Sequence, residues 1–156
     1  MKFLALISSV IALIIQVTAL ELQAPPNVEP LFNITIFANP IPHGPVAIQG
    51  GEQVVLTVAF GAITGALEAT IKGGVVYPSF YENGTIWHVE GKIWGTTKDG
   101  IDFFADEVGI GGPVRRLNRL TFNIGGGHAY LTTAYIITVP TQLNNTVILS
   151  QAFLIN

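Results

Sequence analysis

Cysteine is absent from this chain of 156 residues, and charged residues make up only 11% of it. Without cysteine there are no disulfides, thiolate metal sites or cysteine nucleophiles, so core packing and hydrogen bonds must hold the fold. The chain has seven basic against ten acidic residues and lacks a broad basic patch, which argues against nucleic acid as a partner. The three histidines stand apart, without metal-ligand spacing, and we expect neither a metal nor a cofactor.

Helical periodicity is also lacking. No window of ordinary helix length shows a 3.6-residue apolar period with caps, whereas β-branched and aromatic residues are frequent throughout. The centre of the chain is punctuated at intervals of about ten residues by Gly73-Gly74, Asn83-Gly84 and Asp99-Gly100. Asn-Gly and Asp-Gly pairs favour the tight turns that join antiparallel strands. The sequence therefore predicts an all-β fold.

About nine strands can be placed between these turns. They are predicted at 31–38, 53–60, 62–71, 75–81, 85–97, 101–108, 116–124, 128–139 and 146–154, with a proline-rich loop at 39–45. Gly61 and Gly65 predict a bend or bulge. Because closure removes exposed strand edges, we expect a single antiparallel β-barrel of about eight to nine strands. A β-sandwich is the alternative.

The N-terminal segment is typical of a secretory leader. Lys2 precedes an apolar run, and Val17-Thr18-Ala19 supplies small residues at the cleavage point. We expect residues 1–19 to be a signal peptide and residues 20–156 to be the β-barrel domain. The protein would then lie in the secretory pathway or outside the cell, without stable membrane association after cleavage. An uncleaved membrane anchor is the alternative, although the apolar run is short for one.

Three sequons predict N-glycosylation at Asn33, Asn83 and Asn144. Asn83 is the best placed of them, because it lies at the tip of a predicted hairpin. Several predicted strands are apolar on both faces, which indicates either a well-filled core or a hydrophobic lumen together with an oligomer interface. We expect a homodimer.

The segment around the two tryptophans is the richest in chemical groups. The two-residue period of a strand puts His88, Glu90, Lys92 and Trp94 on one face, and Trp87 on the other. If the first face points into a lumen, His88 and Glu90 form an acid–base pair beside an aromatic wall. If it points outward, the charges are solvated, as charges usually are.

Further candidates lie on the following strands. Asp102, Phe104 and Asp106 share one face, with Phe103 and Glu107 opposite, and the two aspartates are about 13 Å apart, too far for an acid–base dyad. His128 and Tyr130, after three glycines, would share a face and hydrogen-bond a polar ligand. In the basic cluster of Arg115, Arg116 and Arg119, one guanidinium can hold an anion bidentately, and we assign that role to Arg119.

The glycines and turns of the chain follow a family pattern. Pro42-His43-Gly44, Gly73-Gly74, Asn83-Gly84-Thr85 and Thr96-Thr97-Lys98-Asp99-Gly100, followed by Phe103, resemble a family of small β-barrel proteins of formerly unknown function. The resemblance spans roughly residues 31–139. More narrowly, a cysteine-free chain with a leader and sequons looks like the fungal hetero-Diels–Alderases of tropolonic sesquiterpene biosynthesis.

This resemblance implies a cofactor-free enzyme. It would dehydrate a hydroxymethyl tropolone to a quinone methide and let a humulene-type alkene capture that diene, so its partners would be a tropolone and a sesquiterpene alkene. The strand faces then predict two groups of site residues. The catalytic residues would be His88, Glu90 and Tyr130, and the substrate-binding residues Trp94, Phe104, His128 and Arg119. Two other functions remain open, a lipocalin-like carrier of apolar molecules and a secreted structural protein.

Overall fold

The computed structural model describes residues 26–142, 144 and 146–156, so the predicted signal peptide lies outside the described residues. In this part of the chain the structure has nine strands and two 3₁₀ segments. They are β1 (Val28–Ala38), β2 (His43–Ile48), β3 (Gly51–Gly65), β4 (Ala69–Tyr81), η1 (Glu82–Gly84), β5 (Ile86–Thr97), β6 (Asp102–Gly111), β7 (Arg116–Ile124), η2 (Gly126–Thr132), β8 (Ile136–Gln142) and β9 (Val147–Ile155).

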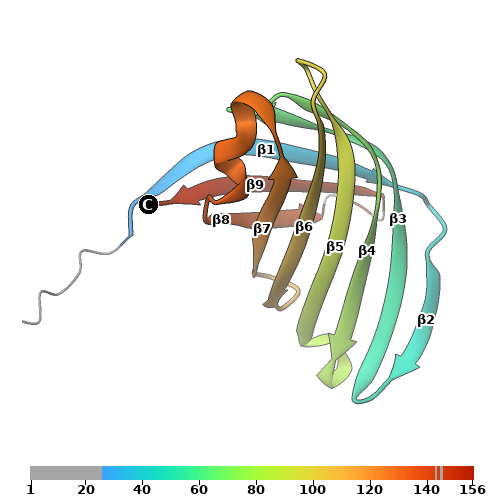
Figure 1. Ribbon diagram of the computed structural model, residues 1–156. Coiled ribbons are helices and arrows are strands. Elements are labelled where there is room, and N and C mark those ends of the chain that lie inside the picture. The colour runs from blue at the N-terminus through green and yellow to red at the C-terminus, as the bar shows by residue number, and fades with distance from the viewer. Residues whose placement is uncertain (1–25, 143, 145) are drawn as a thin grey trace, which may run out of the picture.

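Eight of the strands close into an antiparallel barrel, and β2 is added outside the ring (Figure 1). The closing strand is β1, which pairs with β9 on one side and with β3 on the other. The long strand β3 is shared, since its last residues, from Val58 to Gly65, pair with β1 and its first residues pair with β2. The predicted all-β barrel is confirmed.

Two of the three predicted points of punctuation are confirmed as hairpin turns, whereas Gly73 and Gly74 lie within strand β4. Asn83 and Gly84 lie between β4 and β5 with φ angles of 57° and 83°. Gly100, in the turn between β5 and β6, has φ 87°. Both turns need left-handed backbone, which asparagine and glycine adopt at little cost.

Two boundaries differ from the prediction near the start of the barrel. The segment predicted as a loop contains the edge strand β2, where the missing N–H of Pro45 is tolerated because one side of β2 pairs with no strand of the described chain. The strands predicted at 53–60 and 62–71 are instead one strand, β3, followed by a turn and the start of β4. Gly61 does not break β3, because a Cβ there would lie 2.4 Å from the carbonyl oxygen of Thr35, and glycine lets β1 approach closely.

The strand predicted at 128–139 is also revised. Its first part is the 3₁₀ segment η2, which Gly126 opens with φ 61°, and only Ile136–Gln142 forms strand β8. Leu131 of η2 is completely buried in the core. The segment therefore closes one end of the barrel rather than extending the sheet.

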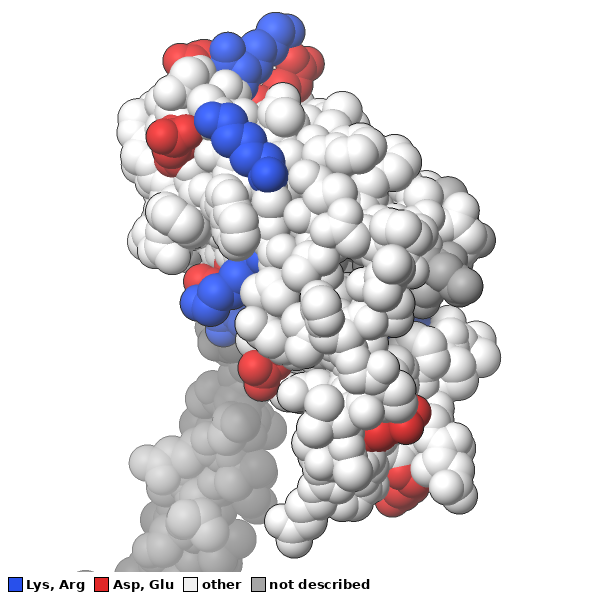
Figure 2. Space-filling view, turned by 90° about the vertical axis from the view of Figure 1, so that its right-hand side faces the viewer, with Lys and Arg blue, Asp and Glu red and all other residues white. Residues whose placement is uncertain are grey.

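The two ends of the barrel differ. Large buried side chains fill the η2 end, where the Phe122 ring contacts those of Phe32 and Phe103 with centroid distances of 5.8 and 5.7 Å. Charges gather outside this end, as Figure 2 shows at the top. In the turn after β5, Lys98 forms an ion pair with Glu68 at 2.7 Å. The turns of the hairpins β2–β3 and β4–β5 lie at the opposite end, at the bottom of Figure 1. This end contains a cavity that is open to solvent.

The ends of the described chain lie side by side. The backbone N–H of Asn27 donates to the carbonyl oxygen of Asn156, and the reverse bond is also made, both at 3.0 Å. Among the described residues, no helix has the length and apolar character needed to cross a membrane.

Candidate functional site

The open end of the barrel contains a cavity of about 270 Å³. Twelve of its fifteen lining residues are apolar, and four of these are prolines. The remaining three are Glu107, Arg116 and Asn118, on the adjacent strands β6 and β7. Ligand pockets usually measure about 300–1,000 Å³, so the cavity suits one small molecule.

Glycines on the inner faces of β5 and β6 make room for the large side chains around them. Gly111 is paired with Trp87 on one side and with Arg116 on the other. Because Gly111 has no side chain, the Arg116 guanidinium reaches across it, with Cζ 4.6 Å from the centroid of the Trp87 ring. A Cβ at Gly111 would lie 2.9 Å from Cγ of Arg116. The glycine therefore permits the stacked pair.

The Trp87 ring is held from two other directions. Its Nε1 donates to the carbonyl oxygen of Gly84 at 2.7 Å, and its ring meets Phe80 edge to face at 4.9 Å. Burial lowers the pKa of the Arg116 guanidinium, and the charge of Glu107 acts in the opposite direction. An arginine remains protonated under such a shift. The mouth of the cavity thus has a fixed aromatic wall carrying a positive charge.

Deeper in the cavity, Glu107 is anchored by two neighbouring strands. Its Oε1 accepts a hydrogen bond from Asn118 Nδ2 at 3.0 Å and another from the hydroxyl of Thr138. No described residue donates to Oε2. Since the amide nitrogen of Asn118 must face the carboxyl group, its Oδ1 points away, and this buried oxygen has no hydrogen-bond partner in the described chain. It lies over Gly109, where a Cβ would be only 1.8 Å from it.

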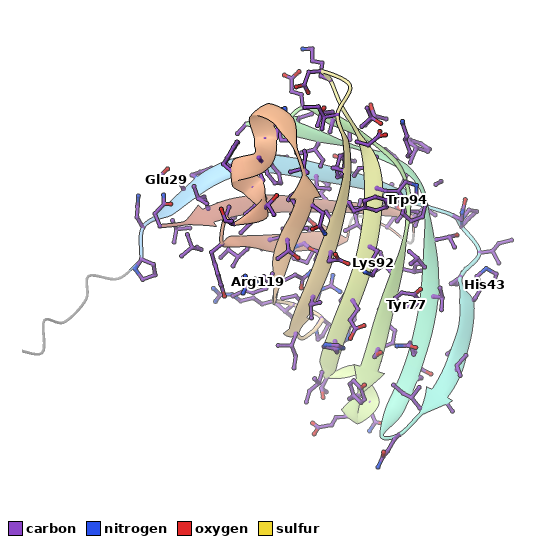
Figure 3. All side chains as sticks on the ribbon, in the orientation of Figure 1. Glu29, His43, Tyr77, Lys92, Trp94 and Arg119 are labelled. Atoms are coloured by element: carbon purple, nitrogen blue, oxygen red, sulfur yellow. The ribbon has the colours of Figure 1, made fainter. Side chains whose placement is uncertain are left out.

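Strand β5 carries both tryptophans, and the face that it turns to the interior is not the face with the predicted catalytic residues. Val89 and Ile93 point inward and are buried, whereas His88, Glu90 and Trp94 lie on the outer face of β5. Figure 3 labels Trp94, which is 42% exposed and lies on the outer side of the barrel wall. The lumenal placement on which the proposed acid–base role depended is therefore not found, because β5 buries its uncharged face and leaves its charges in solvent.

His128 and Tyr130 do not share a strand face. They belong to η2, at the end of the barrel opposite the cavity, and Tyr130 is half exposed. His128 Nε2 lies 3.2 Å from Oδ1 of Asp99. A hydrogen bond from the Thr97 side chain lowers the pKa of Asp99 most, desolvation opposes it, and His128 adds to the lowering. This contact ties η2 to the β5–β6 turn.

The other predicted binding residues are also outside the barrel. Phe104, 61% exposed, is paired with Trp94 across β5 and β6. The Arg119 guanidinium, also labelled in Figure 3, stacks on the Tyr135 ring at 4.5 Å. None of the seven predicted catalytic and binding residues lines the cavity. The three sequon asparagines are all exposed, and their glycosylation stays a prediction: Asn33 on β1, Asn83 in η1 and Asn144 after β8.

Sequence reasoning missed the residues that do line the cavity, although a signal for Glu107 exists. On the face of β6 that also carries Phe103, Ala105 and Gly109, Glu107 is the one charged residue. A lone charge on an otherwise apolar strand face is a buried polar group that needs partners or a function. Arg116 belonged to the predicted basic cluster, but the anion-binding role was assigned to Arg119.

The cavity combines three chemical capacities. Glu107 can accept or return a proton, Arg116 can stabilise a negatively charged or carbonyl oxygen, and the apolar walls exclude water. Within residues 26–142, 144 and 146–156, no three His, Asp or Glu side chains gather in a way that could hold a metal ion.

Comparisons with known proteins place this fold. No protein family and no curated protein matches the chain. Solved structures do match, among them an enzyme from Penicillium herquei, with 18% identity over 85% of this chain and 96% of that one and a TM-score of 0.70. A protein of unknown function from Rhodopseudomonas palustris has 15% identity, 86% and 100% coverage and a TM-score of 0.77. A β-barrel-like protein from Acinetobacter baumannii has 14% identity over 87% of this chain and 99% of that one, with a TM-score of 0.76. Identities this low show a shared fold and leave the activity open.

Proposed function

We propose that this protein is a cofactor-independent enzyme that binds a small, largely apolar substrate in the open end of the barrel and promotes a hetero-Diels–Alder cycloaddition. The observation that carries the proposal is a cavity with apolar walls, one carboxyl group and one guanidinium. The fold shared with a fungal enzyme supports catalysis in general. The resemblance of this cysteine-free chain, with its leader and sequons, to the fungal hetero-Diels–Alderases supports the specific reaction.

In the first step, a hydroxymethyl tropolone would lose water. Glu107 takes the proton of the ring hydroxyl and returns it to the departing hydroxyl oxygen as the C–O bond breaks, so the carboxyl group ends in its starting state and one water is released. Arg116, at the mouth, would hold a conjugated carbonyl oxygen at the other end of the ring, where part of the negative charge accumulates. Both roles use groups whose positions are fixed by hydrogen bonds or stacking.

In the second step, the quinone methide would react with a humulene-type alkene. One C–C bond and one C–O bond form together, and no proton moves, so this step needs only two partners held in a near-attack arrangement. The cavity volume suits one ring system, which leaves the alkene at the open mouth beside Pro40 and Pro42. Exclusion of water by the apolar walls would protect the quinone methide from hydration.

The direct test is a coupled assay with purified protein, a hydroxymethyl tropolone and hydroxyhumulene, read by chiral chromatography and mass spectrometry. We expect one enantiomer to form faster than in a protein-free control. Glu107→Gln should abolish most of the acceleration, whereas Glu90→Gln, on the outer face of β5, should leave it unchanged. A racemic product at the background rate with the unsubstituted protein would refute the proposal.

A non-catalytic carrier is the second candidate, and the predominance of apolar side chains in the cavity favours it. Lipocalin-like binding needs an enclosed apolar surface and no proton acceptor. The same assay separates the two functions. Tight binding of the cycloaddition product without turnover would favour the carrier.

We also propose that the chain is exported, glycosylated and homodimeric. The leader pattern and the exposed sequons support the first two, and apolar side chains such as Ile110 and Leu117, paired on the outer faces of β6 and β7, support a dimer contact. Intact-mass and glycopeptide analysis of protein from a eukaryotic host tests export and glycosylation. Light scattering at several concentrations tests the dimer, and a monomer at all of them would exclude it.

A further inference from the structure

The cavity contains two charges of opposite sign that form no ion pair with each other. Glu107 and Arg116 are the charged residues among those that line it. Neither takes part in the ion pairs formed by the described residues. Charged residues are scarce in this chain, both of these are half-buried, and a charge partly removed from water without an ionic partner is costly. Two such charges in one small cavity indicate that a ligand completes their interactions.

The sheet register separates the two charges along the barrel. Arg116 is paired with Gly111 of β6, and Glu107 lies four residues further along the same strand. At about 3.3 Å per residue, the two positions are about 13 Å apart along β6. The side chains reach toward the cavity between them, which shortens the distance that a ligand must span. One charge therefore lies at the mouth and the other near the floor.

The wall that faces Asn118, at the level between the two charges, is apolar. Pro78 and Val89 are paired across β4 and β5 and line the cavity at the level of Asn118. At the mouth the Trp87 ring adds a flat surface on which Arg116 stacks. A rigid, flat ligand body fits such walls, because aromatic and proline surfaces pack best against planar groups.

We propose that the cavity selects elongated, planar, apolar molecules with polar groups at both ends. A carboxylate or conjugated carbonyl oxygen binds Arg116 at the mouth, and a hydroxyl group donates to Oε2 of Glu107 at the floor. The inference rests on the proposed function in using the same cavity, but it concerns ligand selection and does not require turnover.

The hydrogen-bond pattern of Glu107 supports the donor requirement. Both hydrogen bonds that anchor it end on Oε1, from Asn118 and Thr138. A carboxyl group has acceptor capacity on both oxygens, and Oε2 is the oxygen to which no described residue donates. A ligand hydroxyl satisfies it, whereas a ligand with an apolar end leaves it desolvated without a partner.

Three naphthalene probes test this selection. 6-Hydroxy-2-naphthoic acid has a hydroxyl and a carboxylate at opposite ends, 2-naphthoic acid lacks the hydroxyl, and 2-naphthol lacks the carboxylate. The protein background is Trp94→Phe, which leaves Trp87 as the single tryptophan of a chain that has two. Calorimetric titration at pH 7 gives each Kd, and quenching of Trp87 fluorescence shows that the probe lies in the cavity.

We expect 6-hydroxy-2-naphthoic acid to bind at least about tenfold more tightly than either single-ended probe, since hydrogen bonds to charged groups are among the stronger ones. Arg116→Gln should weaken the two carboxylates and spare 2-naphthol. Glu107→Gln should weaken the two hydroxyl probes and spare 2-naphthoic acid. The outer-face variant Glu90→Gln should change none of the three affinities.

The crossed pattern separates ligand recognition from a general loss of folding, because an unfolded variant loses all three probes together. Equal affinities of the three probes for the unsubstituted protein, or equal losses of all three in both variants, would overturn the inference. Failure of the cycloaddition assay with the crossed pattern intact would refute only the proposed reaction. Loss of the pattern with catalysis intact would refute only the ligand selection.

Discussion

Gly109 of β6 gives the sharpest test of the cavity's construction. It is buried on the inner face of the barrel, and Asn118 Oδ1 lies directly over it. A Cβ built at Gly109 would lie 1.8 Å from that oxygen, 2.4 Å from Asn118 Cγ and 2.7 Å from Asn118 Cα. The last atom belongs to the backbone of β7, so rotation of the Asn118 side chain alone cannot relieve the contact. Gly109→Ala must therefore displace the side chain and separate the two strands locally.

The expected cost combines two contributions. Forcing a methyl group into a packed interior costs about 1–3 kcal/mol, and losing the hydrogen bond from Asn118 to Glu107 costs about 1.5–3 kcal/mol. We expect Gly109→Ala to lower the free energy of unfolding by about 2.5–6 kcal/mol. At about 2–4 °C per kcal/mol, that corresponds to a Tm lower by about 5–24 °C.

Thermal unfolding followed by circular dichroism measures this difference. The matched control is Gly91→Ala on the neighbouring strand β5, also buried and facing inward, where the nearest atom to a Cβ is Cγ2 of Val76 at 3.4 Å. That contact is ordinary, and Tm should change by no more than about 3 °C. If the Tm of Gly109→Ala equals that of Gly91→Ala, the arrangement of Asn118 over Gly109 and against Glu107 is refuted.

Three further outcomes follow from other parts of the structure. Leu131→Ala, in the segment that closes the barrel, should cost about 2–5 kcal/mol in urea unfolding because Leu131 is completely buried, and a smaller change would contradict the closing role of η2. Asp99 has a pKa below its usual 3.8, so its contribution to stability is present above pH 3.8 and is lost as the pH falls through the lowered pKa. Thr97→Val should raise the pKa of Asp99 in a carboxyl NMR titration, and an unchanged pKa would argue against the hydrogen bond from Thr97. Apolar probes should quench Trp87 but not Trp94, as single-tryptophan variants would show, and equal quenching would place the probe outside the cavity.

The sequence predicted most of the fold because its turns carry local signals. Asn83, Gly84 and Gly100 adopt left-handed backbone, which their residue types favour. The alternation of apolar and polar residues predicts most strand positions without knowledge of the partner strands. The errors fall where long-range contacts decide. Gly61 looks like a break in the sequence, but it is a point of close approach to β1, 26 residues earlier, and only the closed barrel shows this.

The candidate site could not be predicted to the same extent. The strand around Trp87 and Trp94 has an aromatic on each face, so aromatic content alone did not select the inner one. Glu90 and Lys92 share the Trp94 face, and because charges are mostly exposed, they indicate that this face points outward. The cavity residues come from all eight strands of the barrel and from the loop after β1. Glycines such as Gly109 and Gly111 leave the space that a specific neighbouring side chain occupies. That role depends on register between strands, which no short segment encodes.

The two ends of the described chain are hydrogen-bonded to each other, so the order of the strands along the chain can be changed by joining these ends and cutting elsewhere. Asn27 and Asn156 exchange two backbone hydrogen bonds, so a short linker can join them without distorting β1 or β9. A circular permutant could then be opened at the turn after Thr97, which lies away from the cavity mouth. Such a chain would begin with β6 and end with β5, and the cavity wall that these two strands form would be assembled only after the rest of the barrel. Comparing its ligand binding with that of the natural order would show whether the cavity depends on connectivity or on strand pairing alone.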